Sequence, residues 1–363
     1  MGITGLFPLI RKHAPHAIEV VPLQSLSGLR IGLDMSIFVH KFWNAAISGI
    51  ARDAKVKAEL FDDGQCDLVP IRTPLSTAES LQEIKRTPVV SMIKQLTRIM
   101  DLGVRPVCVF DGKPPKSKEE CLAVRHADIS QDVDGNLLLH LTRDIALSTL
   151  GKEMMAADDD GAVATPSKKL CVDPEVWSNI KEYVALSGIP YVKSNGEADP
   201  QLAAQCKAGI IDAVWSEDAD LLTFGTPVLY CKYDSKTDNI TRIELSKVLS
   251  GLELNQDEFV DLCILLGCDY SPKIKGIGPV GAYRHIKEKR RIEQVILAPK
   301  VKVGGDFRYE TAREEFAQIR ILAPHSRGLF DPTLMRSFFD LKGYSPRDRD
   351  QACKILARMQ KSE

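Results

Sequence analysis

Seven acidic residues follow predicted strands or helix ends, which is where enzymes usually present their reactive side chains. They are Asp34, Asp111, Glu197, Asp199, Asp218, Asp220 and Asp269. Carboxylates that lie a few ångströms apart raise one another's pKa, so a cluster of them needs positive charge to stay ionised. Divalent cations supply that charge, and an all-oxygen ligand set favours magnesium or manganese over zinc or copper. The residues therefore predict a metal-dependent enzyme that acts on phosphate.

Four of these residues form two pairs with a spacing of two, Glu197 with Asp199 and Asp218 with Asp220. In an extended segment both members of such a pair point to the same side of the chain. Two metal ions about 3.5–4 Å apart can then be bridged, one activating water and one stabilising the leaving oxygen. Either pair alone fits a solvated loop end or a helix cap equally well. The repetition of acids after five apolar runs favours the metal site.

Basic and aromatic residues near these acids suggest contacts to a substrate. Lys118 and Arg125 are seven residues apart, so on a helix they would share one face two turns apart. Cations in that place would hold a phosphate and stabilise developing charge. Phe38 and His40 follow Asp34, and a ring there would stack on an unpaired base. The simpler alternatives are surface cations, a core Phe38 and a neighbouring His40.

A glycine-rich turn with basic flanks forms the second candidate site. Gly276 and Gly278 in KIKGIGPVGA allow backbone N–H groups to approach a phosphate, and the start of the next helix adds its dipole. The basic residues around it are Lys273, Lys275, Arg284, Lys287, Lys289, Arg290 and Arg291. This pattern predicts sequence-independent binding to the backbone of a nucleic-acid duplex. A plain turn between two helices with a solvated basic face is the alternative.

Composition excludes several classes of protein. The chain has 363 residues, 44% of them hydrophobic, and a formal net charge of -1, so nucleic acid must be bound by local patches. Nine scattered cysteines without a C-x-x-C pair argue against a disulfide frame or a zinc site. We find no signal peptide, no apolar run long enough to cross a membrane and no nucleotide-binding loop.

Apolar runs predict five strands, at residues 30–33, 105–110, 189–193, 212–215 and 228–232. One helix is predicted to begin at Thr87-Pro88 and end at Gly103, and another to run from Asp173-Pro174 to Gly188. Alternating strands and helices indicate a mostly parallel α/β sheet, which binds ligands at the carboxyl ends of its strands. The chain becomes helical from about residue 255 onward.

The same pattern divides the chain into four parts. A first block covers residues 1–125 and contains a loop-like insertion at about 45–80; a second insertion covers 126–172. Residues 173–250 complete the sheet, and residues 251–363 form the helical part. The second insertion is acidic and poor in large apolar residues.

Six segments carry a resemblance to a known family. They are MGITGLFPLI, RIGLDMSIFVHKFW, VCVFDGKPPKSK, GIPYVKSNGEADPQLAAQCKAG, WSEDADLLTFGTPVL and FVDLCILLGCDYSPKIKGIGPVGA. In this order the chain resembles the flap endonuclease / XPG-like structure-specific nucleases over most of residues 1–44, 86–125 and 183–295. The resemblance implies a PIN-like, mostly parallel sheet flanked by helices. It also implies a helical arch as the second insertion and a helix-two-turn-helix module that binds duplex DNA.

The family's site residues can be transferred to matching positions. The resemblance implies two Mg²⁺ ions, with Mn²⁺ as a substitute, held by the seven carboxylates, and Lys118 and Arg125 steering the scissile phosphate. Gly2 matches the family's glycine near the DNA, whereas His40 stands where the family usually stacks a tyrosine. Lys273, Lys275, Gly276, Gly278 and Arg284 match the duplex-binding turn.

The implied activity is a magnesium-dependent endonuclease and 5′–3′ exonuclease that cuts branched DNA, such as 5′ flaps, during replication and repair. We expect a monomer without a membrane segment or a small-molecule cofactor, in the nucleus, or in the host nucleus for a divergent viral-type member. The sliding-clamp peptide of cellular relatives is missing from the chain, so clamp binding is not expected. The alternatives are a bubble-cutting repair nuclease, a gap exonuclease, a junction resolvase, a two-metal phosphatase and a non-catalytic scaffold that binds DNA junctions.

Overall fold

The computed structural model describes residues 3–60, 78–118, 172–299, 301–318, 321–325 and 330–361. Gly2, Arg125 and all but the last residue of the predicted arch at 126–172 lie outside these residues. The chain forms two compact units. The first comprises Met1–Phe38, Lys94–Cys121 and Tyr183–Glu363, and the second comprises Val39–Ile93 and Leu122–Glu182. The predicted boundaries at residues 125, 172 and 250 stay a prediction.

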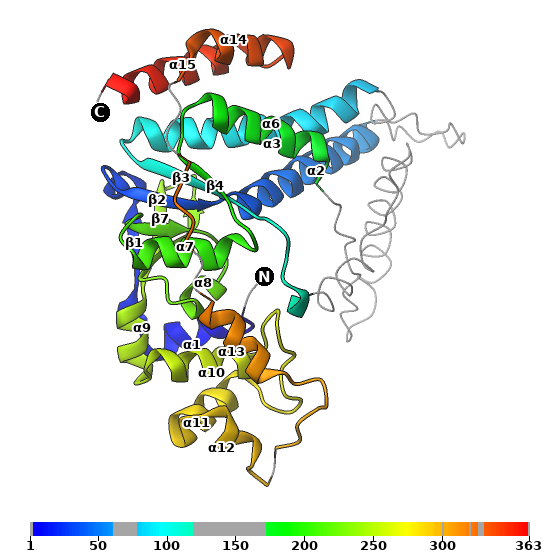
Figure 1. Ribbon diagram of the computed structural model, residues 1–363. Coiled ribbons are helices and arrows are strands. Elements are labelled where there is room, and N and C mark those ends of the chain that lie inside the picture. The colour runs from blue at the N-terminus through cyan, green and yellow to red at the C-terminus, as the bar shows by residue number, and fades with distance from the viewer. Residues whose placement is uncertain are drawn as a thin grey trace, which may run out of the picture. The chain divides into compact units, whose positions relative to one another are not determined.

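A seven-stranded sheet forms the centre of the first unit (Figure 1). Its strands are β1 (Ile18–Pro22), β2 (Arg30–Asp34), β3 (Arg105–Phe110), β4 (Tyr191–Lys193), β5 (Ala213–Trp215), β6 (Val228–Asp234) and β7 (Asn239–Glu244). They lie in the order β1-β7-β6-β5-β2-β3-β4. Strands β2 to β6 pair in parallel, and β7 is antiparallel to both β6 and β1. The prediction of a mostly parallel sheet is confirmed.

The five predicted strands are all present, but β1 and β7 were missed. Strand β1 lies at the edge of the sheet, and Val20 at its centre is 69% exposed. Strand β7 has the sequence NITRIE, in which polar residues outnumber apolar ones. Edge and half-exposed strands lack the continuous apolar run that marks a buried parallel strand.

Helices account for most of the remaining described residues. They are α1 (Leu6–His13), α2 (Met35–Leu60), α3 (Ala78–Asp101), α6 (Pro174–Leu186), α7 (Ala198–Lys207), α8 (Asp220–Thr223), α9 (Leu245–Leu252), α10 (Gln256–Leu266), α11 (Pro279–Lys289), α12 (Ile292–Ile296), α13 (Tyr309–Ala317), α14 (Pro332–Leu341) and α15 (Pro346–Lys361). Short 3₁₀ helices lie at Pro15–Ala17, Leu23–Leu26 and Lys116–Lys118. Helix α6 begins at Pro174 as predicted and ends at Leu186, shortly before the predicted end at Gly188.

Two predictions about the first half of the chain are wrong. Residues 45–60 form the second half of α2 and not a loop, because alanine, lysine and glutamate there favour a helix, while the insertion at about 45–80 stays a prediction. Helix α3 begins at Ala78, so Pro88 lies inside it rather than at its start. Val89 and Met92 are buried beside that proline, and this packing outweighs a local cost of about 3 kcal/mol.

A glycine in the central strand lets a helix approach the sheet closely. A Cβ atom at Gly32 would lie 2.5 Å from Ile211 Cδ1 and 2.6 Å from Leu202 Cδ2. Leu202 belongs to α7, so this helix can contact β2 only where the strand has no side chain. The close packing fixes the start of α7 relative to the end of β2.

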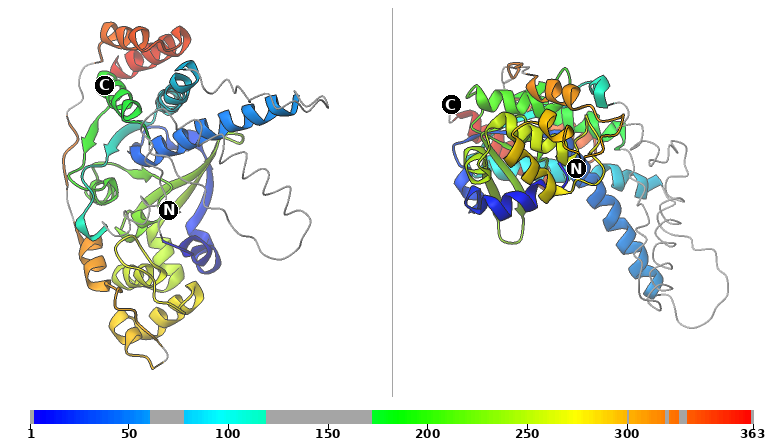
Figure 2. Two further views of the ribbon diagram at one scale, coloured as in Figure 1. Left: turned by 90° about the vertical axis from the view of Figure 1, so that its right-hand side faces the viewer. Right: turned by 90° about the horizontal axis from the view of Figure 1, so that it is seen from below.

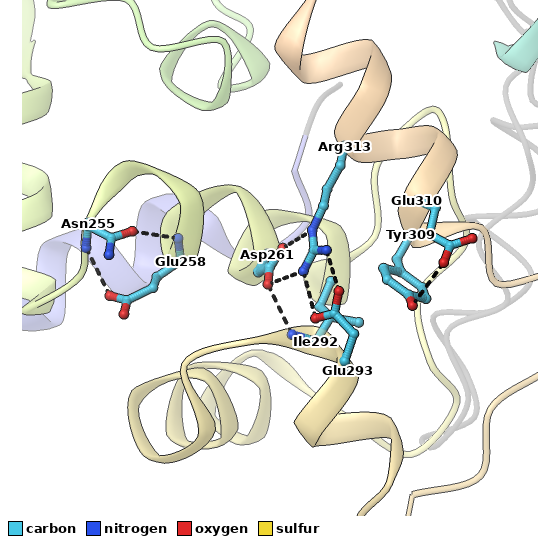
Figure 3. Close-up of polar contacts among 8 residues, drawn as sticks. All are labelled: Asn255, Glu258, Asp261, Ile292, Glu293, Tyr309, Glu310 and Arg313. Atoms are coloured by element: carbon cyan, nitrogen blue, oxygen red, sulfur yellow. Dashed lines mark hydrogen bonds and ion pairs between the residues drawn. The ribbon is translucent and has the colours of Figure 1, made fainter.

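Three of the helices after residue 255 are joined by a partly buried ion-pair network (Figure 3). Arg313 of α13 donates two hydrogen bonds of 2.6 Å to the carboxylate of Asp261 in α10 and two more to Glu293 in α12. Asp261 also accepts the backbone N–H of Ile292 at 3.0 Å. One guanidinium therefore fixes three helices to one another.

The N-terminal helix belongs to the same helical group. Helix α1 contacts α9 and α11, so the first residues of the chain lie beside a segment more than two hundred residues later (Figure 2). A Cβ atom at Gly5 would lie 2.6 Å from Pro279 Cγ, and Gly5 has a left-handed φ of 79°. Glycine therefore allows the N-terminal turn to sit directly on the first turn of α11.

Candidate active site

Six of the seven predicted carboxylates lie at the same edge of the sheet. Asp34 ends β2, Asp111 follows β3, Glu197 and Asp199 follow β4, and Asp218 and Asp220 follow β5. These four strands are neighbours in the order β5-β2-β3-β4 and run in parallel, so their carboxyl ends coincide. The seventh, Asp269, comes from the loop after α10. Burial and the neighbouring Asp111 raise the pKa of Asp34, and burial, Asp218 and Asp269 raise that of Asp220, so these carboxylates lie near one another.

Asp34, at the end of β2, is 4% exposed. Its Oδ1 atom accepts the backbone N–H groups of Ser36 at 3.1 Å and Ile37 at 3.3 Å. Burial, followed by repulsion from Asp111, raises the pKa of Asp34 from 3.8 to about 7. The ionised form of the Asp34 carboxyl is therefore unfavourable in this site as long as no cation is present.

Two further carboxylates have oxygens that lack any hydrogen-bond donor. Asp220 is buried, Asp199 is partly buried, and the Oδ1 atom of each is out of contact with solvent. Neither Oδ1 atom accepts a hydrogen bond from the described residues. Burial and the nearby Asp218 raise the pKa of both groups well above the ordinary value. Buried oxygens of this kind are costly unless a ligand uses their lone pairs.

Lys118 is the cation that the structure places against the cluster. Its Nζ lies 2.8 Å from Asp269 Oδ2 and also pairs with Glu197. Burial alone would lower the pKa of Lys118, but Glu197 and Asp269 raise it well above its usual range. The predicted helix face shared with Arg125 stays a prediction, because Lys118 ends a 3₁₀ helix and Arg125 lies outside the described residues.

Tyr270 and Ser216 also belong to the site, although sequence reasoning missed them. The Tyr270 hydroxyl donates to Glu197 Oε2 at 2.6 Å, and its ring centroid lies 6.0 Å from Lys118 Nζ. The Ser216 hydroxyl lies 3.2 Å from Asp34 Oδ2 and accepts the backbone N–H of Asp218 at 3.1 Å. The sequence offered one signal for them: Tyr270 directly follows Asp269, and Ser216 lies two residues before Asp218. Residues beside a metal ligand often orient that ligand.

The loop after β3 is fixed by a backbone contact that only glycine permits. Gly112 N–H donates to Gly196 O at 2.7 Å, and a Cβ atom at Gly112 would lie 2.0 Å from Ser194 O. Beside it, Asp111 Oδ1 accepts the backbone N–H of Ala198 at 2.7 Å. The loops after β3 and β4 are therefore held together, and with them Asp111 and Glu197.

These residues fit hard divalent cations. Within the described ranges, no three Asp, Glu, His or Cys side chains already surround one point as a finished ligand set. The donor set is nevertheless all oxygen, several carboxylates repel one another, and two buried oxygens have no donor. A divalent cation would remove each of these costs, whereas a zinc site would require His or Cys.

The glycine-rich turn lies between α10 and α11, as predicted. Lys273, Lys275 and Arg284 are exposed, and Gly276 has a left-handed φ of 84°. Gly278 is the N-cap of α11, so the turn presents a helix start and three cations to solvent. Gly2 lies outside the described residues, but Gly5 contacts the first turn of α11, which brings the N-terminal segment beside this surface.

The two rings after Asp34 have different surroundings. Phe38 is a core residue, as the simpler alternative held, and its ring centroid lies 5.5 Å from that of Trp215. His40 is exposed on α2 in the second unit, where its ring centroid lies 6.2 Å from that of Trp177. A base-stacking role for His40 stays a prediction.

Comparison with known proteins gives the family. The XPG N-terminal domain matches residues 74–132, and the XPG I-region matches residues 188–269. Flap endonuclease 1 of Drosophila yakuba is 32% identical over 324 residues, covering 88% of this chain and 74% of that protein. The chain belongs to the flap endonuclease / XPG family. The resemblance carried by the six sequence segments is thereby confirmed.

Other relatives of this family are longer than the chain. Flap endonuclease 1 of Cryptosporidium parvum is 31% identical over 333 residues, covering 87% of this chain but 60% of that protein. The chain spans about half of flap endonuclease 1 of Babesia bovis, 48% of its length at 29% identity.

Solved structures of this family have the same fold. The catalytic core of Rad2 in complex with DNA substrate matches with a TM-score of 0.64 at 18% identity, over 98% of this chain and 99% of that one. Flap endonuclease-1 from Methanococcus jannaschii matches with a TM-score of 0.60 at 19% identity, over 94% and 97%. The predicted PIN-like fold is confirmed. In the part of the chain that the structure describes, no helix is long and apolar enough to cross a membrane.

Proposed function

We propose that the chain is a metal-dependent, structure-specific DNA nuclease. It would act as an endonuclease and 5′–3′ exonuclease that hydrolyses phosphodiesters where single-stranded DNA, such as a 5′ flap, meets a duplex. The observation that carries the proposal is the gathering of six carboxylates at one sheet edge, joined by Asp269 from the loop after α10, with Lys118 against Glu197 and Asp269. Family membership supports the same conclusion.

Two Mg²⁺ ions, or Mn²⁺ in their place, would be held by Asp34, Asp111, Glu197, Asp199, Asp218, Asp220 and Asp269. When bound, the metals would activate water and stabilise the leaving oxygen of the phosphodiester. Lys118 would hold the scissile phosphate and offset the charge that develops on it, with Arg125 as a second cation. Tyr270 and Ser216 would orient Glu197, Asp34 and Asp218 through the hydrogen bonds described above.

The glycine-rich turn would bind the duplex next to the cut. Lys273, Lys275 and Arg284 would contact phosphates, while the backbone at Gly276 and Gly278 would allow close approach. Such contacts carry no base information, so the shape of the junction rather than its sequence would select the substrate. The N-terminal segment that begins at Gly2 would extend this surface. The proposed substrate implies a location with DNA, of which the nucleus is the predicted one, and a chain that works as a monomer.

A labelled 5′-flap duplex, incubated with the purified chain and Mg²⁺ or with EDTA, tests the proposal. We expect a cut at the flap base that requires Mg²⁺, and equal flaps of unrelated sequence should be cut alike. Asp218→Asn should reduce cleavage to background while duplex binding persists. Asp257→Asn, an exposed acid at the start of α10, is the matched control and should cut normally. Binding without any cutting of flap, bubble, gapped or four-way substrates would instead favour a non-catalytic scaffold.

The role of the turn is tested by salt dependence. Lys275→Ala should weaken duplex binding for every sequence and reduce the slope of log affinity against log salt by about 1. Catalysis at saturating DNA should change little, because the exposed Lys275 side chain would serve DNA binding rather than the chemical step. An unchanged slope would contradict phosphate binding by Lys275.

A further inference from the structure

A strained residue in β6 faces the loop that carries two of the carboxylates. Lys232 has a φ of 53°, a left-handed conformation that side chains other than glycine rarely adopt. The pairing of β6 with β7 shifts register between Cys231 and Asp234, so the strand bulges at this point. Backbone strain of this kind persists only where the surroundings stabilise it, and it is frequent at functional sites.

The bulge directs one backbone N–H group at Glu217. Lys232 N–H donates to both carboxylate oxygens of Glu217, at 3.1 Å and 3.0 Å. In a regular strand, by contrast, backbone N–H groups bond to the neighbouring strand. The Lys232 side chain lies over another part of the fold, with its Nζ 4.4 Å from the centroid of the Phe7 ring in α1. That contact helps to hold a non-glycine residue in the left-handed conformation.

Glu217 directly precedes Asp218 in the short loop between β5 and α8. The loop is held on one side by Ser216, whose hydroxyl contacts Asp34 and whose N–H donates to Tyr230 O at 3.0 Å. Asp220 N–H in turn donates to Asp218 Oδ1 at 3.1 Å. The contact from Glu217 to Lys232 therefore ties the loop to β6 at the residue between Ser216 and Asp218.

We propose that Glu217 is a positioning residue for the metal centre, anchored on the backbone of the Lys232 bulge. This inference rests on the proposed function for the role of Asp218 and Asp220 as metal ligands. Glu217 would not touch the metal. It would hold the loop so that both aspartates keep their orientation when a cation binds. Outer contacts of this kind typically change metal affinity by about 10–100-fold.

Calorimetric titration of Mn²⁺ into the DNA-free chain tests the inference without using activity. Glu217→Ala should weaken Mn²⁺ binding by about 10-fold or more, and Glu217→Gln, which keeps one acceptor oxygen, should lie between it and the parent. Glu244→Gln is the matched control, because Glu244 ends β7, the strand next to β6, and pairs with Arg242 of the same strand and Lys247 of α9; it should change affinity less than about 2-fold. Thermal unfolding in EDTA checks that all variants fold.

Equal Mn²⁺ affinity in Glu217→Ala and Glu244→Gln would overturn the inference while leaving the nuclease proposal intact. A different outcome is that Glu217→Ala binds Mn²⁺ more weakly than the parent chain, while the parent chain cuts none of the DNA substrates. This outcome would support the positioning role and contradict the nuclease proposal. If Glu217→Ala fails to fold, Glu217→Gln decides: an affinity equal to that of the parent overturns the inference.

Discussion

Lys118 Nζ and Asp269 Oδ2 lie 2.8 Å apart, and the same ammonium pairs with Glu197. One lysine thus bridges carboxylates from two segments that are 72 residues apart in the sequence. Each of the three side chains is about one-seventh exposed. In the metal-free protein, Lys118 therefore balances part of the charge that metal ions would otherwise neutralise.

Replacing Lys118 with methionine should affect both stability and catalysis. Without metal, removal of one partner of a largely buried ion pair should destabilise the fold by about 3 kcal/mol, measured by urea unfolding in EDTA at pH 7.5. Flap cleavage should fall by about a hundredfold or more, since a cation near the scissile phosphate is lost. Lys116→Met, an exposed position in the same 3₁₀ helix, should match the parent. Normal cleavage by Lys118→Met would exclude a direct role for this lysine.

Tyr270→Phe should weaken the metal centre without disturbing the core. The substitution keeps the ring but removes the donor to Glu197 Oε2, so Glu197 loses an orienting contact. We expect about a 10-fold loss of Mn²⁺ affinity and a similar loss of cleavage, measured by calorimetry and single-turnover kinetics. Tyr283→Phe removes a hydroxyl that donates to Leu252 O, and it should leave Mn²⁺ affinity unchanged. A loss of stability alone in Tyr270→Phe would mean that this hydroxyl has a purely structural role.

The metal-free protein should become less stable as the pH rises from about 4 to about 7. The pKa of Asp34 rises from 3.8 to about 7 on folding, so the native state binds more protons than the unfolded state within this interval. Stability decreases with pH wherever the native state holds the extra protons. Thermal unfolding in EDTA at several pH values measures the effect, and saturating Mg²⁺ should abolish most of it.

Thermal unfolding of the Asp199→Asn variant in EDTA provides a check. The amide removes a buried charge, so the metal-free variant should be more stable than the parent at pH 7.5 while its cleavage is lost. A parent chain whose unfolding temperature in EDTA rises over this interval would show that the cluster is not the main source of the pH dependence.

Arg313→Ala should unfold the helical region beyond residue 255 more easily. Asp261 is buried, and removal of Arg313 would leave its charge with the backbone N–H of Ile292 but without a cation, at a cost of about 3 kcal/mol. Urea unfolding at pH 7 measures this cost. Arg349→Ala breaks exposed pairs with Asp340 and Asp350 and should cost much less. Equal losses in the two variants would contradict a special role for the Arg313 network.

The network also predicts a change at acid pH. Arg313 lowers the pKa of Glu293 from 4.5 to about 2, so its stabilising effect is present above pH 4.5 and disappears as the pH falls toward 2. In Arg313→Ala, the loss of folding stability as the pH falls from 4.5 toward 2 should be smaller than in the parent. The difference should be modest because Glu293 is partly exposed.

Local sequence patterns were sufficient to predict the parallel strands, because a buried strand needs a continuous apolar run. The acidic residues at the ends of these strands could be predicted because they directly follow such runs. Local patterns were insufficient for β1 and β7, whose exposed faces carry no such run. Pro88 suggested a helix start, but the packing of Val89 and Met92 overrode it. Local patterns do not reveal the partners of contacts between distant segments, such as Tyr270 with Glu197 and Lys232 with Glu217, even where a residue such as Tyr270 adjoins a predicted ligand.

The order of the strands has a consequence for protein synthesis. Strand β2 lies between β3 and β5, although β5 is made more than 170 residues after β2. A chain that is still growing on the ribosome lacks Asp218, Asp220 and Asp269 until those residues have emerged, whatever the earlier strands have formed. The complete carboxylate set therefore arises only late in translation, so an unfinished chain would present the cell with an incomplete centre.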